Sequence, residues 1–102
     1  MPEPMNLAHF ESLLNSRFVL HVDDQRQVDL ALFSVQALPA YPGRAGQVSR
    51  QQPFSLLFRG PREFILPQKI HSMEHESLGK FEMFLVPIGP DEIGQRYEAI
   101  FN

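Results

Sequence analysis

The fold is decided by the stretch Phe54-Ser-Leu-Leu-Phe-Arg-Gly60-Pro61, in which large apolar residues recur at nearly every second position. A period of two places one set of side chains on one face of a β-sheet. Most of the blocks that follow, over 66–75, 80–87 and 96–102, repeat this alternation and are separated by segments rich in glycine or proline. The second half of the chain is therefore expected to form short strands.

The first half adds a short helix and a hairpin to these strands. Asn6 is a suitable N-cap for a helix over about 7–15, whose apolar residues recur at helical spacing. The segments 17–22 and 27–38 alternate as strands around a turn at Asp23-Asp24-Gln25, and the alternation changes phase near Leu32, which predicts a β-bulge. We expect an all-β fold, a small antiparallel β-barrel or sandwich of about six strands with a short N-terminal helix.

The domain organisation and the core follow from the same pattern. Residues 1–5 are expected to form a flexible leader, and 6–102 a single β domain. The alternating apolar sets predict a core of Phe18, Leu20, Val22, Leu30, Leu32, Phe54, Leu56, Phe58, Phe81, Met83, Leu85, Tyr97, Ala99 and Phe101.

Composition excludes several classes of site and partner. The 102 residues include no cysteine, which removes disulfides, thiol nucleophiles and cysteine-ligated zinc. The net charge is −3 and the basic residues are scattered, so we expect no nucleic-acid partner. The chain shows neither a secretory signal nor an apolar run of membrane-spanning length, so we expect no membrane association and a cytoplasmic location.

Histidine is the first candidate for metal binding or acid–base chemistry. His71 and His75 are four residues apart in a predicted strand, which separates them by about 13 Å at ~3.3 Å per residue. His9 lies on the predicted helix and His21 on another strand. We therefore expect structural histidines, with no metal and no cofactor.

Other catalytic patterns are absent or have simpler explanations. The pairs Asp23-Asp24 and Asp91-Glu92 occupy predicted turns, where aspartate bonds its own backbone. There is no Gly-x-Ser-x-Gly elbow, and Gly89 and Gly94 are not followed by the Lys-Ser/Thr of a phosphate-binding loop. We expect no catalytic residues and no enzyme activity.

Two features are less easily explained by structure alone. The four residues Arg44, Arg50, Arg59 and Arg62 are candidates for a basic rim that binds an acidic partner, although solubilising charges are the simpler interpretation. The first two lie in the long segment 39–52, which we expect to be mobile. The last strand, 95–101, is either internal and critical to the fold or an edge for a partner, and its apolar face favours the internal position.

Most of the chain resembles a family of uncharacterised bacterial proteins of about 100 residues. The resemblance is carried by the blocks Phe54–Pro61, Leu66–Gln68, Glu74-His75, Leu78-Gly79, Phe84–Gly89 and Tyr97–Asn102. It implies an association with gene groups for phage-tail-collar-like fibre proteins, and hence an accessory or assembly role. The chain departs from the family pattern at Lys69, Ile70 and His71, where glycine, threonine and an aromatic residue are usual.

These observations lead to two functional hypotheses. The first is a non-enzymatic protein-interaction or assembly-accessory module with an unidentified protein partner, linked to a phage-tail-like fibre system and able to form a homo-oligomer. The alternative is a small ligand-binding β-barrel or minor enzyme with a site at the barrel mouth. A filled interior together with an exposed apolar patch would favour the first, and a cavity with convergent polar groups the second.

Overall fold

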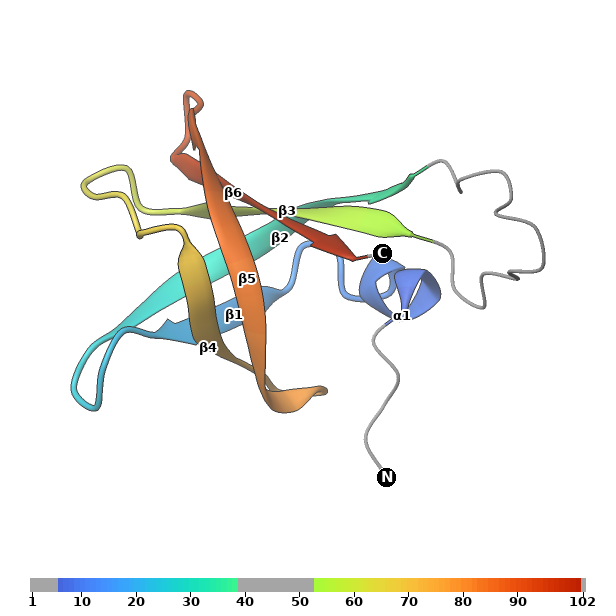
Figure 1. The fold of residues 1–102 in the computed structure, drawn as a ribbon, viewed down its shortest axis with the longest axis horizontal. Coiled ribbons are helices and arrows are strands. Elements are labelled where there is room, and N and C mark those ends of the chain that lie inside the picture. The colour runs from blue at the N-terminus through green and yellow to red at the C-terminus, as the bar shows by residue number, and fades with distance from the viewer. Residues whose placement is uncertain (1–5, 39–52, 102) are drawn as a thin grey trace.

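The protein is a closed antiparallel β-barrel of six strands, seen here in a computed structural model that describes residues 6–38 and 53–101. One short helix, α1 (Leu7–Glu11), precedes the strands β1 (Arg17–His21), β2 (Gln27–Ala37), β3 (Phe54–Gly60), β4 (Lys69–His75), β5 (Gly79–Pro90) and β6 (Gln95–Phe101). The strand order around the barrel is β1-β2-β3-β6-β5-β4, with β4 closing on β1 (Figure 1). The predicted all-β fold is confirmed, and of the two architectures expected, barrel or sandwich, the barrel is the one observed.

The two longest strands each pair with two neighbours in succession. The first part of β2 pairs with β1 and its second part with β3, and the predicted phase change appears as a register shift between Leu32 and Ser34. In the same way, residues 79–85 of β5 pair with β4 and residues 86–90 with β6. Such strands bend around the barrel and let six strands close it.

The C-terminal strand is internal over its first half. β6 pairs with β3 along its whole length, from Phe101 opposite Phe54 to Gln95 opposite Gly60, and its first half also pairs with β5. The internal position that its apolar face favours is therefore observed for residues 95–98, whereas 99–101 pair with β3 alone among the described strands.

Helix α1 is shorter than predicted. Asn6 caps it as expected, its side chain accepting the backbone N–H of His9 at 2.8 Å, but the helix ends at Glu11 instead of continuing to about residue 15. Asn15 adopts a left-handed φ of 69° and donates its backbone N–H to Leu32 at 2.7 Å. Pairing with β2 therefore draws the chain out of the helix.

Aromatic and aliphatic side chains fill the inside of the barrel. Phe10 of α1 is fully buried and packs against Phe18, Phe54 and Phe101, with ring centroids 5.7–6.4 Å apart. Eleven residues of the predicted core are buried: Phe18, Leu20, Leu30, Leu32, Phe54, Leu56, Phe58, Met83, Leu85, Tyr97 and Ala99. The alternation therefore predicts the inward face of every strand except β4.

Three predicted core residues differ from this expectation. Val22 is 39% exposed, because β1 ends at His21 and Val22 already belongs to the turn, where its N–H donates to Arg26. Phe81 and Phe101 are half-buried at the margin of the core. The core also contains Phe10, Leu13, Val28, Leu66 and Met73, which the predicted set omits.

Two further expectations concern mobility and membranes. The predicted leader 1–5 and mobile segment 39–52 lie outside the described residues. Within the described residues, no helix has the length and apolar character needed to cross a membrane.

Candidate functional site

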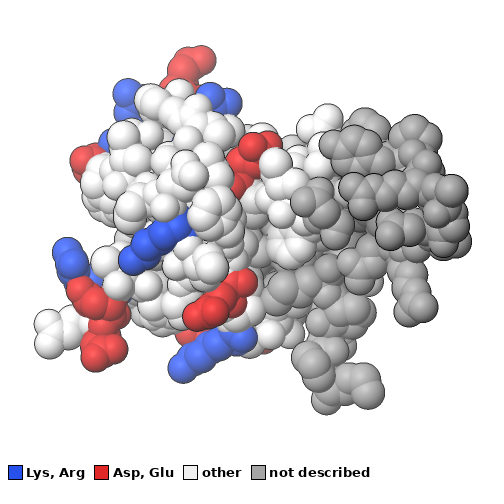
Figure 2. All heavy atoms as spheres, viewed as in Figure 1, with Lys and Arg blue, Asp and Glu red and all other residues white. Residues whose placement is uncertain are grey.

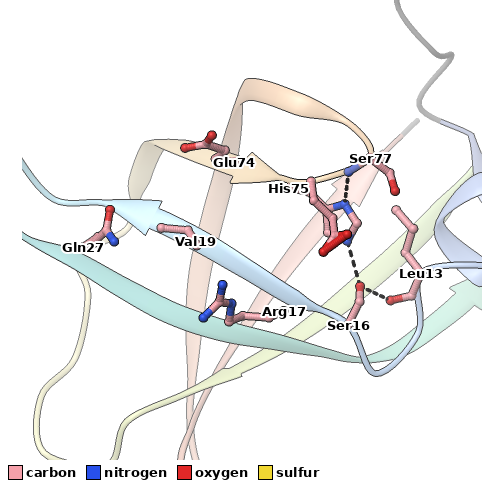
Figure 3. Close-up of a pocket in the computed structure, with 9 residues that line it drawn as sticks. Leu13, Ser16, Arg17, Val19, Gln27, Glu74, His75 and Ser77 are labelled. Atoms are coloured by element: carbon pink, nitrogen blue, oxygen red, sulfur yellow. Dashed lines mark hydrogen bonds between the residues drawn. The ribbon is translucent and has the colours of Figure 1, made fainter.

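A hollow of about 530 Å³ opens where the start of β1 meets the end of β4. Its lining includes Arg17 and Val19 of β1 together with Glu74 and His75 at the end of β4 (Figure 3). Val19 pairs with Glu74, and the residues next to them in sequence, Leu20 and Met73, point into the core. The hollow thus lies where the outer surface of β1 meets the inward-facing His75 and the core residue Leu13.

His75 is the most constrained side chain of this hollow. It is 4% exposed, and its ring lies 4.5 Å from that of Phe18. The backbone N–H of Ser77 donates to Nδ1 at 2.9 Å, and Ser16 Oγ lies 3.0 Å from Nε2 (Figure 3). Because Nδ1 must accept, the neutral ring carries its proton on Nε2 and donates it to Ser16.

The protonation state of His75 follows from its surroundings. Burial lowers the pKa of the imidazole, because the charged form loses hydration; Glu76 opposes this effect and His9 adds to it. A second proton would also sit on Nδ1, directly against the Ser77 N–H that now donates to it. His75 is therefore held as a neutral ring that ties the β4–β5 turn to the start of β1.

Ser16 and His75 lack the arrangement that activates a nucleophilic serine. The Ser16 hydroxyl donates to the carbonyl of Leu13 at 2.5 Å, so it can only accept from His75 Nε2. General-base activation needs the opposite direction, with the serine proton held by an unprotonated imidazole nitrogen. In this geometry the pair joins three segments of backbone and does not prepare an attack.

The remaining strand histidines are also engaged. His21 Nε2 lies 2.9 Å from Glu74 on the barrel surface, and His71, which is buried, bonds the carbonyl of Pro67 through Nε2 at 2.7 Å. Among the described residues no group of three or more His, Asp or Glu side chains is arranged to hold a metal ion.

The predicted basic rim lies partly within the described chain. Arg59 makes a two-point contact with the Asp91 carboxylate and lies over the Phe33 ring at 3.9 Å from its centroid. Arg62 donates to the Asp91 carbonyl at 2.8 Å, whereas Arg44 and Arg50 lie outside the described residues. Arg59 and Arg62 therefore both stabilise the β5–β6 turn by bonding Asp91.

Asp91 is the acceptor that these contacts in the β5–β6 turn share. Its Oδ1 also accepts the backbone N–H groups of Ile93 and Gly94, each at 2.9 Å. Hydrogen bonding from Arg59, followed by that from the backbone of Gly94, holds the pKa of the Asp91 carboxyl well below its usual value. Asp91 was predicted to lie in a turn, and its carboxylate accepts two backbone N–H groups of that turn that have no backbone partner among the described residues.

An apolar surface on β4 and β5 is the feature that sequence reasoning missed. Ile70 and Phe84 are direct cross-strand partners, yet their exposed fractions are 60% and 49%. The face that carries β5 bears both acidic and basic side chains, several of them side by side, on an otherwise uncharged surface (Figure 2). The signal was available in the run Met83-Phe84-Leu85-Val86, because a strand with inward Met83 and Leu85 must direct Phe84 outward.

Comparison with known proteins gives a family. The model of the family described as Domain of unknown function (DUF6916) matches residues 5–101. No curated protein and no solved structure shows a significant match to the chain.

Proposed function

The chain belongs to the DUF6916 family, and we propose that it is a non-enzymatic protein-interaction module that binds a protein partner through the outward face of β4 and β5. The observation that carries this proposal is the exposed pair Ile70 and Phe84. Paired strands usually turn their large apolar residues inward, and exposed apolar clusters on small domains commonly mark interaction surfaces.

The packing of the barrel supports this choice over ligand binding. Large side chains fill the interior, and Phe58, Leu56 and Leu85 are 0% exposed. In the hollow beside His75, the polar atoms of the Ser16–His75 pair are bonded to protein groups. Such groups support the local backbone and offer little to a small molecule.

The partner expected from this surface presents apolar side chains of its own. An aromatic side chain beside an aliphatic one makes a small anchor, and the centres of protein interfaces are typically built this way. Glu82 is exposed on β5 and, two residues from Phe84, projects from the same outward face at the margin of the anchor. An accessory role in the assembly of a phage-tail-like fibre system is the specific form of this proposal, and it rests on the sequence resemblance.

The proposal is tested by retention of partners on immobilised protein. Wild type, the double variant Ile70→Ser/Phe84→Ser and the control Ile93→Ser would be exposed to lysate of the native cell and compared by quantitative mass spectrometry. Ile93 is 70% exposed but lies in the β5–β6 turn, so it controls for the loss of an exposed apolar residue.

Specific proteins should be retained by wild type and by Ile93→Ser, and lost with the double variant. Retention that is equal for all three variants, or no protein retained above the bare matrix, would contradict the proposed function.

A further inference from the structure

The first half of β5 has a neighbouring strand on one side only. Residues Gly79 to Leu85 pair with β4, and pairing with β6 begins at Val86. No other described segment forms a backbone hydrogen bond with 79–85. A strand edge of this kind presents unpaired N–H and C=O groups on which another strand can add.

Two charges of opposite sign stand on this edge. Lys80 and Glu82 are both exposed and, being two residues apart, project from the same outward face. Opposite them on β4 are Glu74, which already contacts His21, and Ser72. Within the described residues, neither Lys80 nor Glu82 takes part in an ion pair.

The geometry points to a second copy of this chain as the partner: we propose that two barrels associate by antiparallel pairing of their β5 edges around Phe81. In a two-fold antiparallel pair, outward residues face outward residues, so the axis passes through one residue of each strand. An axis through Lys80 or Glu82 would place like charges opposite each other. An axis through Phe81 places Lys80 of each copy opposite Glu82 of the other, forming two identical ion pairs.

The inward side of the edge fits the same axis. Phe81 is half-buried and packs at the margin of the core, so its ring would meet the ring of Phe81 in the second copy. Met83 would face Gly79, which adds no side-chain bulk at that position. Such a dimer extends one sheet across both barrels and places two Ile70–Phe84 pairs on a common face. The inference does not depend on the proposed function, because the edge and its charges exist whether or not a different protein binds.

The test uses charge reversal and mixing. The mass of the full-length protein would be measured by size-exclusion chromatography with light scattering over a range of concentrations. Wild type should show a concentration-dependent dimer. Lys80→Glu and Glu82→Lys should each weaken dimerisation about 10-fold or more, because each replaces two attractive cross-strand pairs by two repulsive ones.

Mixing separates this register from a general charge effect. The two single variants combined in equal amounts should form a heterodimer, and the double variant Lys80→Glu/Glu82→Lys should regain self-association. Lys69→Glu makes the same change of net charge on the neighbouring strand β4 and should leave the dimer intact. A wild type that stays monomeric at every concentration overturns the proposal. So does a dimer that Lys80→Glu leaves unchanged, or a mixture in which the single variants fail to associate.

Discussion

Two phenylalanines on opposite sides of the barrel wall provide the sharpest test of the fold. Phe58 lies in β3 with no exposed surface and meets the Phe18 ring edge-on at a centroid distance of 5.1 Å, whereas Phe84 on β5 is 49% exposed. Truncation to alanine removes the same atoms from both. The two sites should therefore differ only in what surrounds the ring.

The magnitude for Phe58→Ala follows from burial. Replacing a fully buried phenylalanine by alanine typically costs about 3–5 kcal/mol, including the cavity that remains, and the edge-on contact contributes about 1 kcal/mol of this. A domain of this size has a total stability of about 5–15 kcal/mol, so the variant should be severely weakened. Phe84→Ala should cost less than about 1 kcal/mol, because a half-exposed ring leaves no enclosed cavity.

Urea denaturation followed by circular dichroism measures both values, with the slope of the transition checking that two-state unfolding is preserved. A loss below about 1 kcal/mol for Phe58→Ala, or an equal loss for both variants, would refute the assignment of inward and outward faces.

Three further predictions follow from specific contacts. The contribution of His75 to stability should be fully present above pH 6.5 and be lost as the pH falls below that value, because the lowered pKa of His75 means that the unfolded chain binds the proton more readily. His75→Gln should therefore flatten this part of the profile of urea midpoint against pH. Gly94→Ala should lower the melting temperature by more than Gly79→Ala. A Cβ on Gly94 would lie 2.1 Å from the carbonyl oxygen of Gly60, whereas a Cβ on Gly79 would meet open space and only the positive φ would be strained. Calorimetry giving the reverse order would count against the close approach of β3 to the β5–β6 turn. Deleting residues 99–102 should abolish the cooperative fold, because it removes the buried Ala99 and the strand that pairs with residues 54–56 of β3. A truncated protein with native circular dichroism would contradict this role of the end of β6.

The sequence predicted the barrel well because alternation is a local property. Phe54, Leu56 and Phe58 reveal their inward direction within one strand, and the phase change at Leu32 reveals a bulge without knowledge of its partner. The helix was predicted too long because its end depends on Asn15 pairing with β2, a contact between separate segments. His75 could not be placed for the same reason, since Ser16, its hydrogen-bond partner, lies 59 residues away in sequence.

The prediction of the candidate surface was also limited by contacts between segments that are far apart in sequence. Phe84 could be expected to point outward from its own strand, but its pairing with Ile70 depends on the register of β4 against β5. β4 itself alternates less clearly, because the polar His71 and His75 occupy inward positions beside Met73. Arg59 was a candidate for a partner-binding rim, with a solubilising charge as the simpler interpretation, and only the fold brings it to Asp91 in the β5–β6 turn.

Site-specific photo-crosslinking in the native cell tests the central claim, that the outward face of β4 and β5 binds another protein. A photoreactive phenylalanine analogue would replace Phe84 in one strain and the exposed turn residue Ile93 in another. The account predicts discrete crosslinked species from position 84, identified by mass spectrometry as a protein other than this chain, and none of these species from position 93. Position 84 giving no crosslinked protein, or the same products as position 93, would contradict it.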